Sequence, residues 1–330
     1  MRIVFAGSPR FAVPTLERLA AGGGYDLCAV IAQPDRPSGR DQHLQASPVK
    51  EAALRLGLPV HQPQKIKSDS ARALLETLKP DAMVVVGYGQ ILPPWLLDLP
   101  RLGCINLHGS LLPAYRGAAP IQWAVVNGEF RTGLTTMRMD PGMDTGPILL
   151  QWETQIGPEE TAAELSERMS LAGPELMIQT IQGLENGSLQ AQPQDNSRAS
   201  RAPLLRKEHG RIDWNLSAAE IFNRVRGFLP WPGAFTEFRG QKLQIWWALP
   251  DDRLSYIGRI PELQAQGHSD VEASAELAAG QLTVHGEHLR VHCGGGTRLL
   301  LLEVQLEGKR RMPAADFIRG ARPRVGEHLL

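Results

Sequence analysis

Short, almost wholly apolar runs alternate with amphipathic segments through the first third of the chain. The apolar runs predict buried strands over residues 2–6, 27–32 and 81–86 and in the segment that contains Asn106. Apolar positions at helical spacing predict helices over residues 9–21, 48–57 and 69–78 and near Trp95. Continuous apolar strands separated by helices are typical of a parallel sheet with both faces covered. Ligands of such α/β sheets bind beyond the carboxyl ends of the strands.

The pattern then changes from single strands to paired strands. Residues 133–156 predict two strands around the turn Asp140–Pro147. A helix follows through Met169, begun by a capping box that Thr161 and Glu164 form, and a second helical run covers residues 174–185.

An almost entirely polar stretch over residues 186–203 is the best candidate for a linker. Beyond it, a helix from Ser217 to Gly227 and several short runs of alternating polarity predict a small β-barrel. These runs cover residues 234–238, 242–248, 281–285, 288–292 and 298–304. We expect a first domain over residues 1–190, a linker over residues 191–207 and a second domain over residues 208–330.

Composition narrows the protein class without deciding the function. The 330 residues are 42% hydrophobic and 21% charged, which suits a globular protein with two domains. The formal net charge is zero, so any attraction to nucleic acid has to come from local patches. Cys28, Cys104 and Cys293 are far apart and lie in or beside apolar runs, which favours buried thiols over disulfides or a metal site. We expect no metal, no membrane span and a cytoplasmic location, because no apolar run approaches about 20 residues and the first strand begins directly after Met1.

The segment Cys104–Pro113 carries the most informative chemistry, together with the turn that holds Asp144. Asn106 and His108 are two residues apart at the end of a strand, so their side chains lie on one face. An amide can donate to an oxyanion, an imidazole can exchange a proton near neutral pH, and a carboxylate can orient and stabilise that imidazole. A lone histidine after an apolar strand is more often a buried structural group. Three polar groups on strand ends and turns favour an acyl-type transfer site with no metal and no side-chain nucleophile.

Three further segments each allow two interpretations. The loop Ser110–Pro113 with the following Arg116 is either a surface loop or a wall that holds a flat aromatic ligand. The long polar loop after Gln33 is either solvated or a phosphate contact through Arg36, Arg40 and His43. The basic C-terminal end, which begins with Lys309, Arg310 and Arg311, is either a solvated face or an RNA-backbone patch.

These motifs together resemble those of the methionyl-tRNA formyltransferases over nearly the whole chain. The matching segments are Phe5–Pro9, Gln33–Pro37, Ser47–Lys50, Asn106–Pro113, Arg116–Gln122 and Met139–Gly146 in the first domain, and Arg211–Trp214, Ser217–Ala219 and Pro230–Pro232 in the second. The set Asn106, His108 and Asp144 alone marks the wider group of enzymes that use 10-formyltetrahydrofolate. The matches in the second domain narrow the resemblance to the tRNA enzymes.

The resemblance implies a Rossmann-like formyltransferase domain followed by an OB-like barrel that helps to hold tRNA. It implies that Asn106, His108 and Asp144 are catalytic, and that Ser110, Leu111, Leu112 and Pro113 line the site of 10-formyltetrahydrofolate, the formyl donor. It also implies action on initiator methionyl-tRNA, with Arg40 at the family's key loop arginine. We further expect a monomer, and tRNA contacts from Arg36, Lys309, Arg310 and Arg311. Relatives commonly have more basic residues after that arginine, whereas this chain has Asp41-Gln42-His43. We therefore expect this loop to bind phosphate more weakly than in those relatives, or Arg36 and the C-terminal arginines to make the phosphate contacts instead.

Two other functions stay open at this point. The same three residues could formylate a nucleotide-sugar amine or glycinamide ribonucleotide, or hydrolyse formyl-folate. The second domain argues against these reactions, because small substrates need no RNA-sized surface. A non-catalytic RNA- or folate-binding module is the other possibility, and the intact set of Asn106, His108 and Asp144 argues against it.

Overall fold

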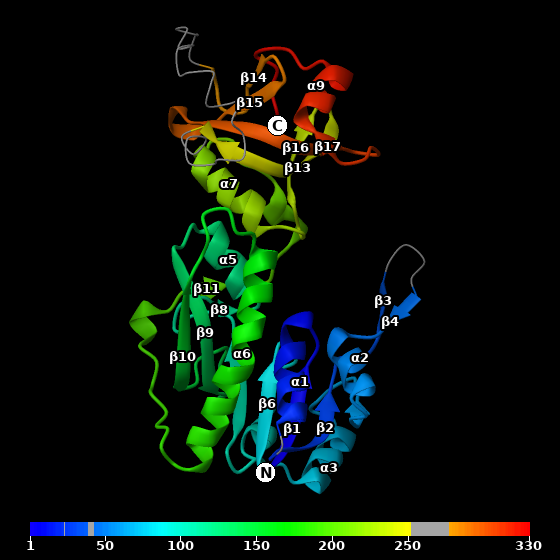
Figure 1. The fold of residues 1–330 in the computed structure, drawn as a ribbon, viewed down its shortest axis with the longest axis vertical. Coiled ribbons are helices and arrows are strands. Elements are labelled where there is room, and N and C mark those ends of the chain that lie inside the picture. Colours follow the sequence, from blue (N-terminus) through cyan, green and yellow to red (C-terminus); the bar gives the residue numbers. More distant parts are fainter. Residues whose placement is uncertain (23, 39–42, 252–276) are drawn as a thin grey trace. The chain divides into compact units, whose positions relative to one another are not determined.

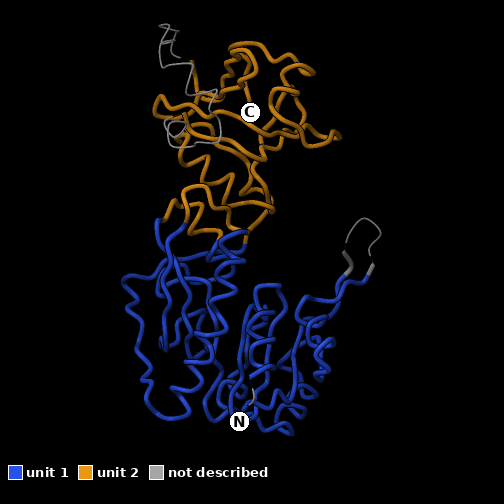
Figure 2. The backbone as a smooth tube through the Cα atoms, viewed as in Figure 1, with its two compact units in different colours: residues 1–121, 130–156, 164–204 blue, residues 122–129, 157–163, 205–330 orange. Residues whose placement is uncertain are grey.

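The computed structural model describes residues 1–22, 24–38, 43–251 and 277–330. Contacts divide the chain into two compact units, which Figure 2 shows in different colours. The first unit consists of residues 1–121, 130–156 and 164–204, and the second of residues 122–129, 157–163 and 205–330. Within the described ranges, no helix is long and apolar enough to cross a membrane.

A seven-stranded sheet in the order β10-β9-β7-β6-β1-β2-β5 forms the centre of the first unit (Figure 1). The strands are β1 (Arg2–Gly7), β2 (Asp26–Ile31), β5 (Val60–His61), β6 (Ala82–Val86), β7 (Cys104–His108), β9 (Arg131–Arg138) and β10 (Ile148–Gln155). The five strands from β5 to β7 are parallel, and β9 and β10 are added antiparallel beside β7. The predicted parallel sheet and the predicted strand pair after it are both confirmed.

Helices cover both faces of this sheet, and the central strands are therefore buried on both sides. They are the short helix η1 (Arg10–Ala12), α1 (Val13–Ala21), α2 (Pro48–Arg55), α3 (Asp69–Leu78), α4 (Pro94–Leu97) and α6 (Ala162–Glu185). Ser47 and Ser68 begin α2 and α3 at the expected places, since each hydroxyl accepts a hydrogen bond from a backbone N–H three residues later. A small hairpin, β3 (Arg36–Ser38) with β4 (His43–Gln45), leads out of the sheet after β2.

Helix α6 corrects one expectation from the sequence. The pattern predicted two helical runs, whereas the structure has one helix that continues through Pro174. Proline removes one N–H donor from the helix interior, which normally favours a break. Here Gly173 brings the helix against the sheet, where an added Cβ would lie 2.7 Å from Leu107 and 3.8 Å from Leu134. Close packing of the helix on the sheet holds it continuous despite the missing hydrogen bond.

A polar segment at residues 186–204 returns along the first unit after α6. We call residues 191–204 the strap. It contains a short helix, η2 (Asn196–Arg198), and a strand, β11 (Arg201–Ala202), which pairs in parallel with β8 (Arg116–Gly117). These residues belong to the predicted linker, yet the contacts place them in the first unit. The domain boundaries at residues 190 and 207 stay a prediction.

The second unit is built on an antiparallel sheet. Its strands are β12 (Ala234–Phe238), β13 (Gln241–Pro250), β14 (Leu282–His285), β15 (His288–His292), β16 (Arg298–Leu306) and β17 (Met312–Pro313), in the order β12-β13-β16-β15-β14 with β17 beside β16. Its helices within the described residues are η3 (Lys207–Gly210), α7 (Ala218–Gly227), η5 (Gly294–Gly296), α9 (Ala314–Ala321) and most of α5 (Pro120–Val126). The predicted fold class was a Rossmann-like parallel-sheet domain followed by a small OB-like β-barrel domain. It is confirmed as a parallel α/β domain followed by an antiparallel β-sheet domain.

Two segments from the first half of the sequence complete the second unit. Trp123 of α5 packs edge-on against Phe228, with ring centroids 5.8 Å apart. The buried Arg226 donates hydrogen bonds to the backbone carbonyls of Gly157 and Glu160. The chain therefore crosses into the second unit twice before it stays there, which a sequence division at one linker does not capture.

Candidate active site

Strand β7 presents Asn106 and His108 at its carboxyl end. Both lie on one face, opposite Met137 and Thr135 of β9, and their exposed fractions are only 8% and 6%. Among the described residues, the side-chain amide of Asn106 has no hydrogen-bond partner. Buried polar groups are normally paired, so this nearly buried amide is a candidate donor to a ligand.

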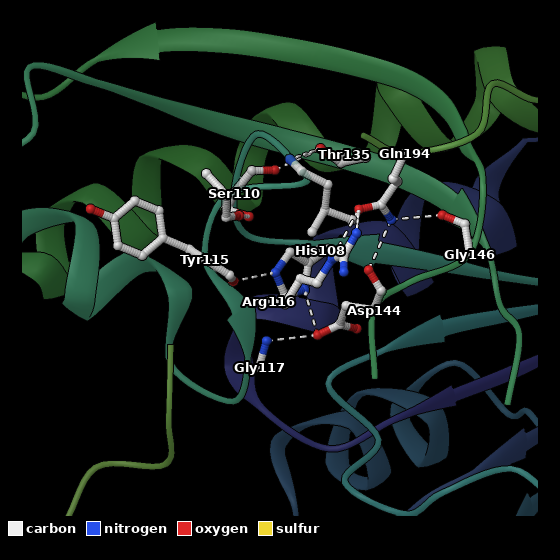
Figure 3. A network of polar contacts seen from close by, with 11 residues as sticks. His108, Ser110, Tyr115, Arg116, Gly117, Thr135, Asp144, Gly146 and Gln194 are labelled. Atoms are coloured by element: carbon white, nitrogen blue, oxygen red, sulfur yellow. Dashed lines mark hydrogen bonds and ion pairs between the residues drawn. The ribbon is translucent and has the colours of Figure 1, made fainter. Parts of the chain in front are cut away.

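The imidazole of His108 lies between the backbone of Tyr115 and the carboxylate of Asp144 (Figure 3). Its Nε2 lies 2.9 Å from the backbone carbonyl of Tyr115. Because a carbonyl only accepts, Nε2 carries a hydrogen. Its Nδ1 faces Asp144, with Nδ1 and Oδ2 3.7 Å apart. That distance allows electrostatic stabilisation of an imidazolium but is too long for a hydrogen bond. Among the described residues, Nδ1 therefore has no hydrogen-bond partner.

Asp144 is held in an uncommon backbone conformation by the turn around it. Its φ of 53° lies in the left-handed region, which costs energy for a residue other than glycine. Its Oδ2 accepts a hydrogen bond of 2.8 Å from the backbone N–H of Gly117. At the start of the turn, the Asp140 carboxylate accepts hydrogen bonds from the N–H of Gly142 and the hydroxyl of Thr145. The turn and the loop after β7 together fix the carboxylate beside His108.

The loop Ser110–Pro113 is braced from β9 and β10. The buried hydroxyl of Thr135 donates to the carbonyl of Ser110 at 2.7 Å and accepts from the N–H of Leu112 at 3.0 Å. Gln151 of β10 donates to the carbonyl of Leu112 at 2.9 Å. The backbone of this loop is therefore fixed by polar contacts, with Leu112 buried and Leu111 half-buried beside it.

The predicted contacts in the loop after Gln33 are described only in part. Arg36 is exposed on β3 and makes no ion pair within the described residues. Arg40, with Asp41 and Gln42, lies outside the described residues. Lys50 forms an ion pair of 2.6 Å with Asp35, and Gln62 donates to the same carboxylate, so the base of the hairpin is anchored. Those two contacts hold the pKa of Asp35 below its ordinary value.

The predicted C-terminal contacts lie in the second unit, at the turn between β16 and β17. Lys309 and Arg310 are exposed and make no ion pair with any described residue. Arg311 pairs with Glu303 and lies over the ring of Trp246, 4.8 Å from its centroid. Lys309 and Arg310 are therefore the freer cations of this turn.

Sequence reasoning missed the residues that position the predicted site. Thr135 had no distinct signal, because it is one of three threonines in the strand Arg131–Arg138. Tyr115 and Gly117 act through backbone groups, for which the residue type gives no signal. Gln194, which joins the strap to the turn of Asp144, sits in a stretch that looks like a linker. Within the described ranges, no group of three or more His, Cys, Asp and Glu side chains could hold a metal ion.

Comparison with known proteins relates this geometry to a family. Residues 1–181 match the family model described as formyl transferase, and residues 204–322 match that of the formyl transferase C-terminal domain. The methionyl-tRNA formyltransferase of Koribacter versatilis is 50% identical over 330 residues, which covers 100% of this chain and 98% of the relative. That of Acidobacterium capsulatum is 51% identical over 321 residues, covering 97% and 96%.

A solved structure supports the fold independently. The N-formyltransferase from Helicobacter canadensis, in complex with folinic acid and dTDP-3-aminofucose, superposes with a TM-score of 0.64 over 91% of this chain and 98% of that one. Its sequence is 18% identical, so the likeness concerns the fold alone. With two family models matched in order and half of all positions shared with full-length relatives, this chain belongs to the formyl transferase family, among the methionyl-tRNA formyltransferases.

Proposed function

We propose that this chain transfers the formyl group of 10-formyltetrahydrofolate to the α-amino group of methionine on initiator tRNA. The observation that carries the proposal is the nearly buried amide of Asn106, which has no partner in the described part of the chain and lies beside the pair of His108 and Asp144. The choice of substrates is supported by membership of the family and by the likeness to methionyl-tRNA formyltransferases, which are 50–51% identical over nearly the full chain. A cytoplasmic location and a monomeric state stay predictions.

In this proposal, Asn106 and His108 stabilise the charge that develops on the formyl oxygen. The amide of Asn106 donates one hydrogen bond, and the protonated Nδ1 of His108 donates a second, because Nε2 is already engaged with Tyr115. The carboxylate of Asp144 stabilises this imidazolium from 3.7 Å. Pre-placed donors of this kind need little rearrangement during the reaction.

Asp144 is also suited to take the proton that the attacking amine loses. Its Oδ2 accepts from Gly117, whereas Oδ1 accepts no hydrogen bond from any described residue. The amine forms a bond to the formyl carbon and loses one proton to this carboxylate. The bond between the formyl carbon and the donor nitrogen then breaks, and that nitrogen receives the proton from the carboxyl group of Asp144, which returns to its carboxylate form. The net reaction consumes no proton.

The residues present fit the formyl donor. Tetrahydrofolate carries a flat ring system with amide-like edges, which suits a fixed backbone beside apolar side chains. The loop Ser110–Pro113 offers such a surface, since Thr135 and Gln151 lock its backbone. When bound, the donor supplies an activated formyl group. The chain itself orients it and provides the hydrogen bonds to its carbonyl.

Formyl transfer to charged initiator tRNA tests the proposal directly. Uncharged initiator tRNA and charged elongator tRNA serve as controls for the acceptor. Asn106→Asp keeps the size of the side chain but removes its N–H donor, so kcat should fall by about 10²–10³. Near-normal turnover of this variant would remove Asn106 from the mechanism. Transfer only to a small amine, such as a nucleotide sugar, would keep the site and replace the acceptor.

The basic C-terminal turn is proposed to contact the tRNA backbone. Each phosphate contact that is lost reduces the slope of log K against log salt by about one. Neutralising Lys309 and Arg310 together should therefore flatten this slope for tRNA binding. Neutralising the ion-paired Arg311 alone should change it less, because its charge is already balanced by Glu303. An unchanged slope in the double variant would exclude this turn from the interface.

A further inference from the structure

Gln194 of the strap connects the two segments that form the candidate site (Figure 3). Its Nε2 donates to the backbone carbonyls of Asp144 and Gly146, at 2.8 and 2.7 Å. Its Oε1 accepts from both Nε and a terminal nitrogen of Arg116, at 3.1 and 2.7 Å. One half-buried amide therefore uses its donors on the turn of Asp144 and its acceptor on the loop after β7.

Both segments depend on this junction for their geometry. The left-handed backbone at Asp144 needs surrounding contacts to persist, and Gln194 holds the carbonyl of that same residue. Arg116, which Gln194 holds on the other side, precedes Gly117, the backbone donor to the Asp144 carboxylate. The strap also fixes the residue before Arg116, because the hydroxyl of Ser200 accepts from the N–H of Tyr115. The carbonyl of Tyr115 is the partner of His108.

We propose that Gln194 is a positioning residue that sets the separation between the Asp144 carboxylate and the His108 imidazole. The strap is then a working part of the catalytic unit and not a passive connection. Only a primary amide serves here, because the site requires two N–H donors for the carbonyls and one acceptor for the guanidinium. The effect on turnover rests on the proposed function, whereas the effect on the geometry does not.

Two variants separate the donor from the acceptor. Gln194→Glu keeps the shape and the acceptor for Arg116 but loses both donors, so the two carbonyls of the turn face a carboxylate. Gln194→Met removes donors and acceptor at similar length. Gln192→Glu is the matched control, because it makes the same change two residues earlier in the strap. The side chain of Gln192 is exposed and makes no hydrogen bond with a described residue, although its backbone pairs with Ile148.

Turnover provides the first measurement. Catalytic groups misplaced by about 1 Å can lose on the order of 100-fold in rate. Gln194→Glu should therefore lower kcat for formyl transfer by about 10- to 100-fold, with the KM for each substrate changed by less than about threefold. A merely structural role would instead lower the amount of folded protein and leave kcat per folded molecule unchanged. Gln192→Glu should match the unaltered protein.

Backbone hydrogen exchange of the full chain provides the second measurement and needs no activity. The N–H of Gly117 is protected by the Asp144 carboxylate, so its exchange should become at least tenfold faster in both Gln194 variants and not in Gln192→Glu. If Gln194→Met does not fold, Gln194→Glu decides the matter. Unchanged kcat and unchanged exchange in Gln194→Glu would overturn the inference. No formyl transfer by the unaltered protein would overturn the proposed function, and exchange at Gly117 would still decide on Gln194.

Discussion

The hydroxyl of Thr135 provides a sharp test of how the site is braced. Thr135 is fully buried, and its hydroxyl donates to the carbonyl of Ser110 and accepts from the N–H of Leu112. It also accepts from Nε2 of Gln151, which keeps a second partner in the carbonyl of Leu112. Thr135→Val keeps the shape of the side chain, so no cavity forms. Two buried backbone groups lose a partner, and each costs about 1–3 kcal/mol, so the free energy of unfolding should fall by about 2–6 kcal/mol.

The assay is thermal and urea unfolding, combined with the KM for the formyl donor. For a unit of this size, a loss of 2 kcal/mol lowers Tm by about 4–8 °C. The KM should rise as well, because the braced loop is the proposed donor site. Thr132→Val is the control: Thr132 is buried on the same strand, but its hydroxyl makes no hydrogen bond with a described residue. Equal stability of the two variants would refute the reasoning.

Three further predictions concern titration, thiol reactivity and the turn of Asp144. Burial, with help from the positive charge of Arg298, lowers the pKa of His292. The neutral imidazole therefore contributes to the free energy of unfolding above about pH 6.5, and this contribution is lost as the pH falls. In urea unfolding, the free energy of unfolding of His292→Gln should fall less between pH 7.5 and 5.5 than that of the unaltered protein. His285→Gln, at an exposed position, is the control and should show the same fall as the unaltered protein. Burial raises the pKa of Cys104 and of Cys293 to about 12. Iodoacetamide at pH 8 should therefore label neither thiol until urea is added, which mass spectrometry can measure. Rapid labelling of the folded protein would contradict the burial of these thiols. A Cβ at Gly146 would lie 1.9 Å from a backbone carbonyl of β9. Gly146→Ala should therefore shift the turn and lower kcat on the order of 100-fold, while the circular dichroism spectrum stays unchanged. Full activity of this variant would show that the turn tolerates movement.

Local patterns in the sequence determined the elements of this fold. The apolar runs of β1, β6 and β7 and the serine caps of α2 and α3 act within a few residues, so the sequence shows them directly. The candidate residues Asn106, His108 and Asp144 were also visible, because polar side chains at the ends of apolar strands indicate a ligand edge. Pro174 led to a wrong prediction for the same reason. A proline locally favours a break in a helix, whereas packing of α6 against the sheet keeps the helix continuous.

Contacts between distant residues were decided only by the tertiary structure. The amide of Gln194 reaches Asp144 across 50 positions of the chain, and the backbone of Tyr115 meets Ser200 across 85. Their partners depend on strand register and on where the strap returns, and the sequence around Gln194 has the composition of a linker. The assignment of residues 122–129 and 157–163 to the second unit arises in the same way. The sequence thus determined which groups carry the chemistry, whereas folding alone determined which groups hold them in place, because hydrogen bonds form between neighbours in space.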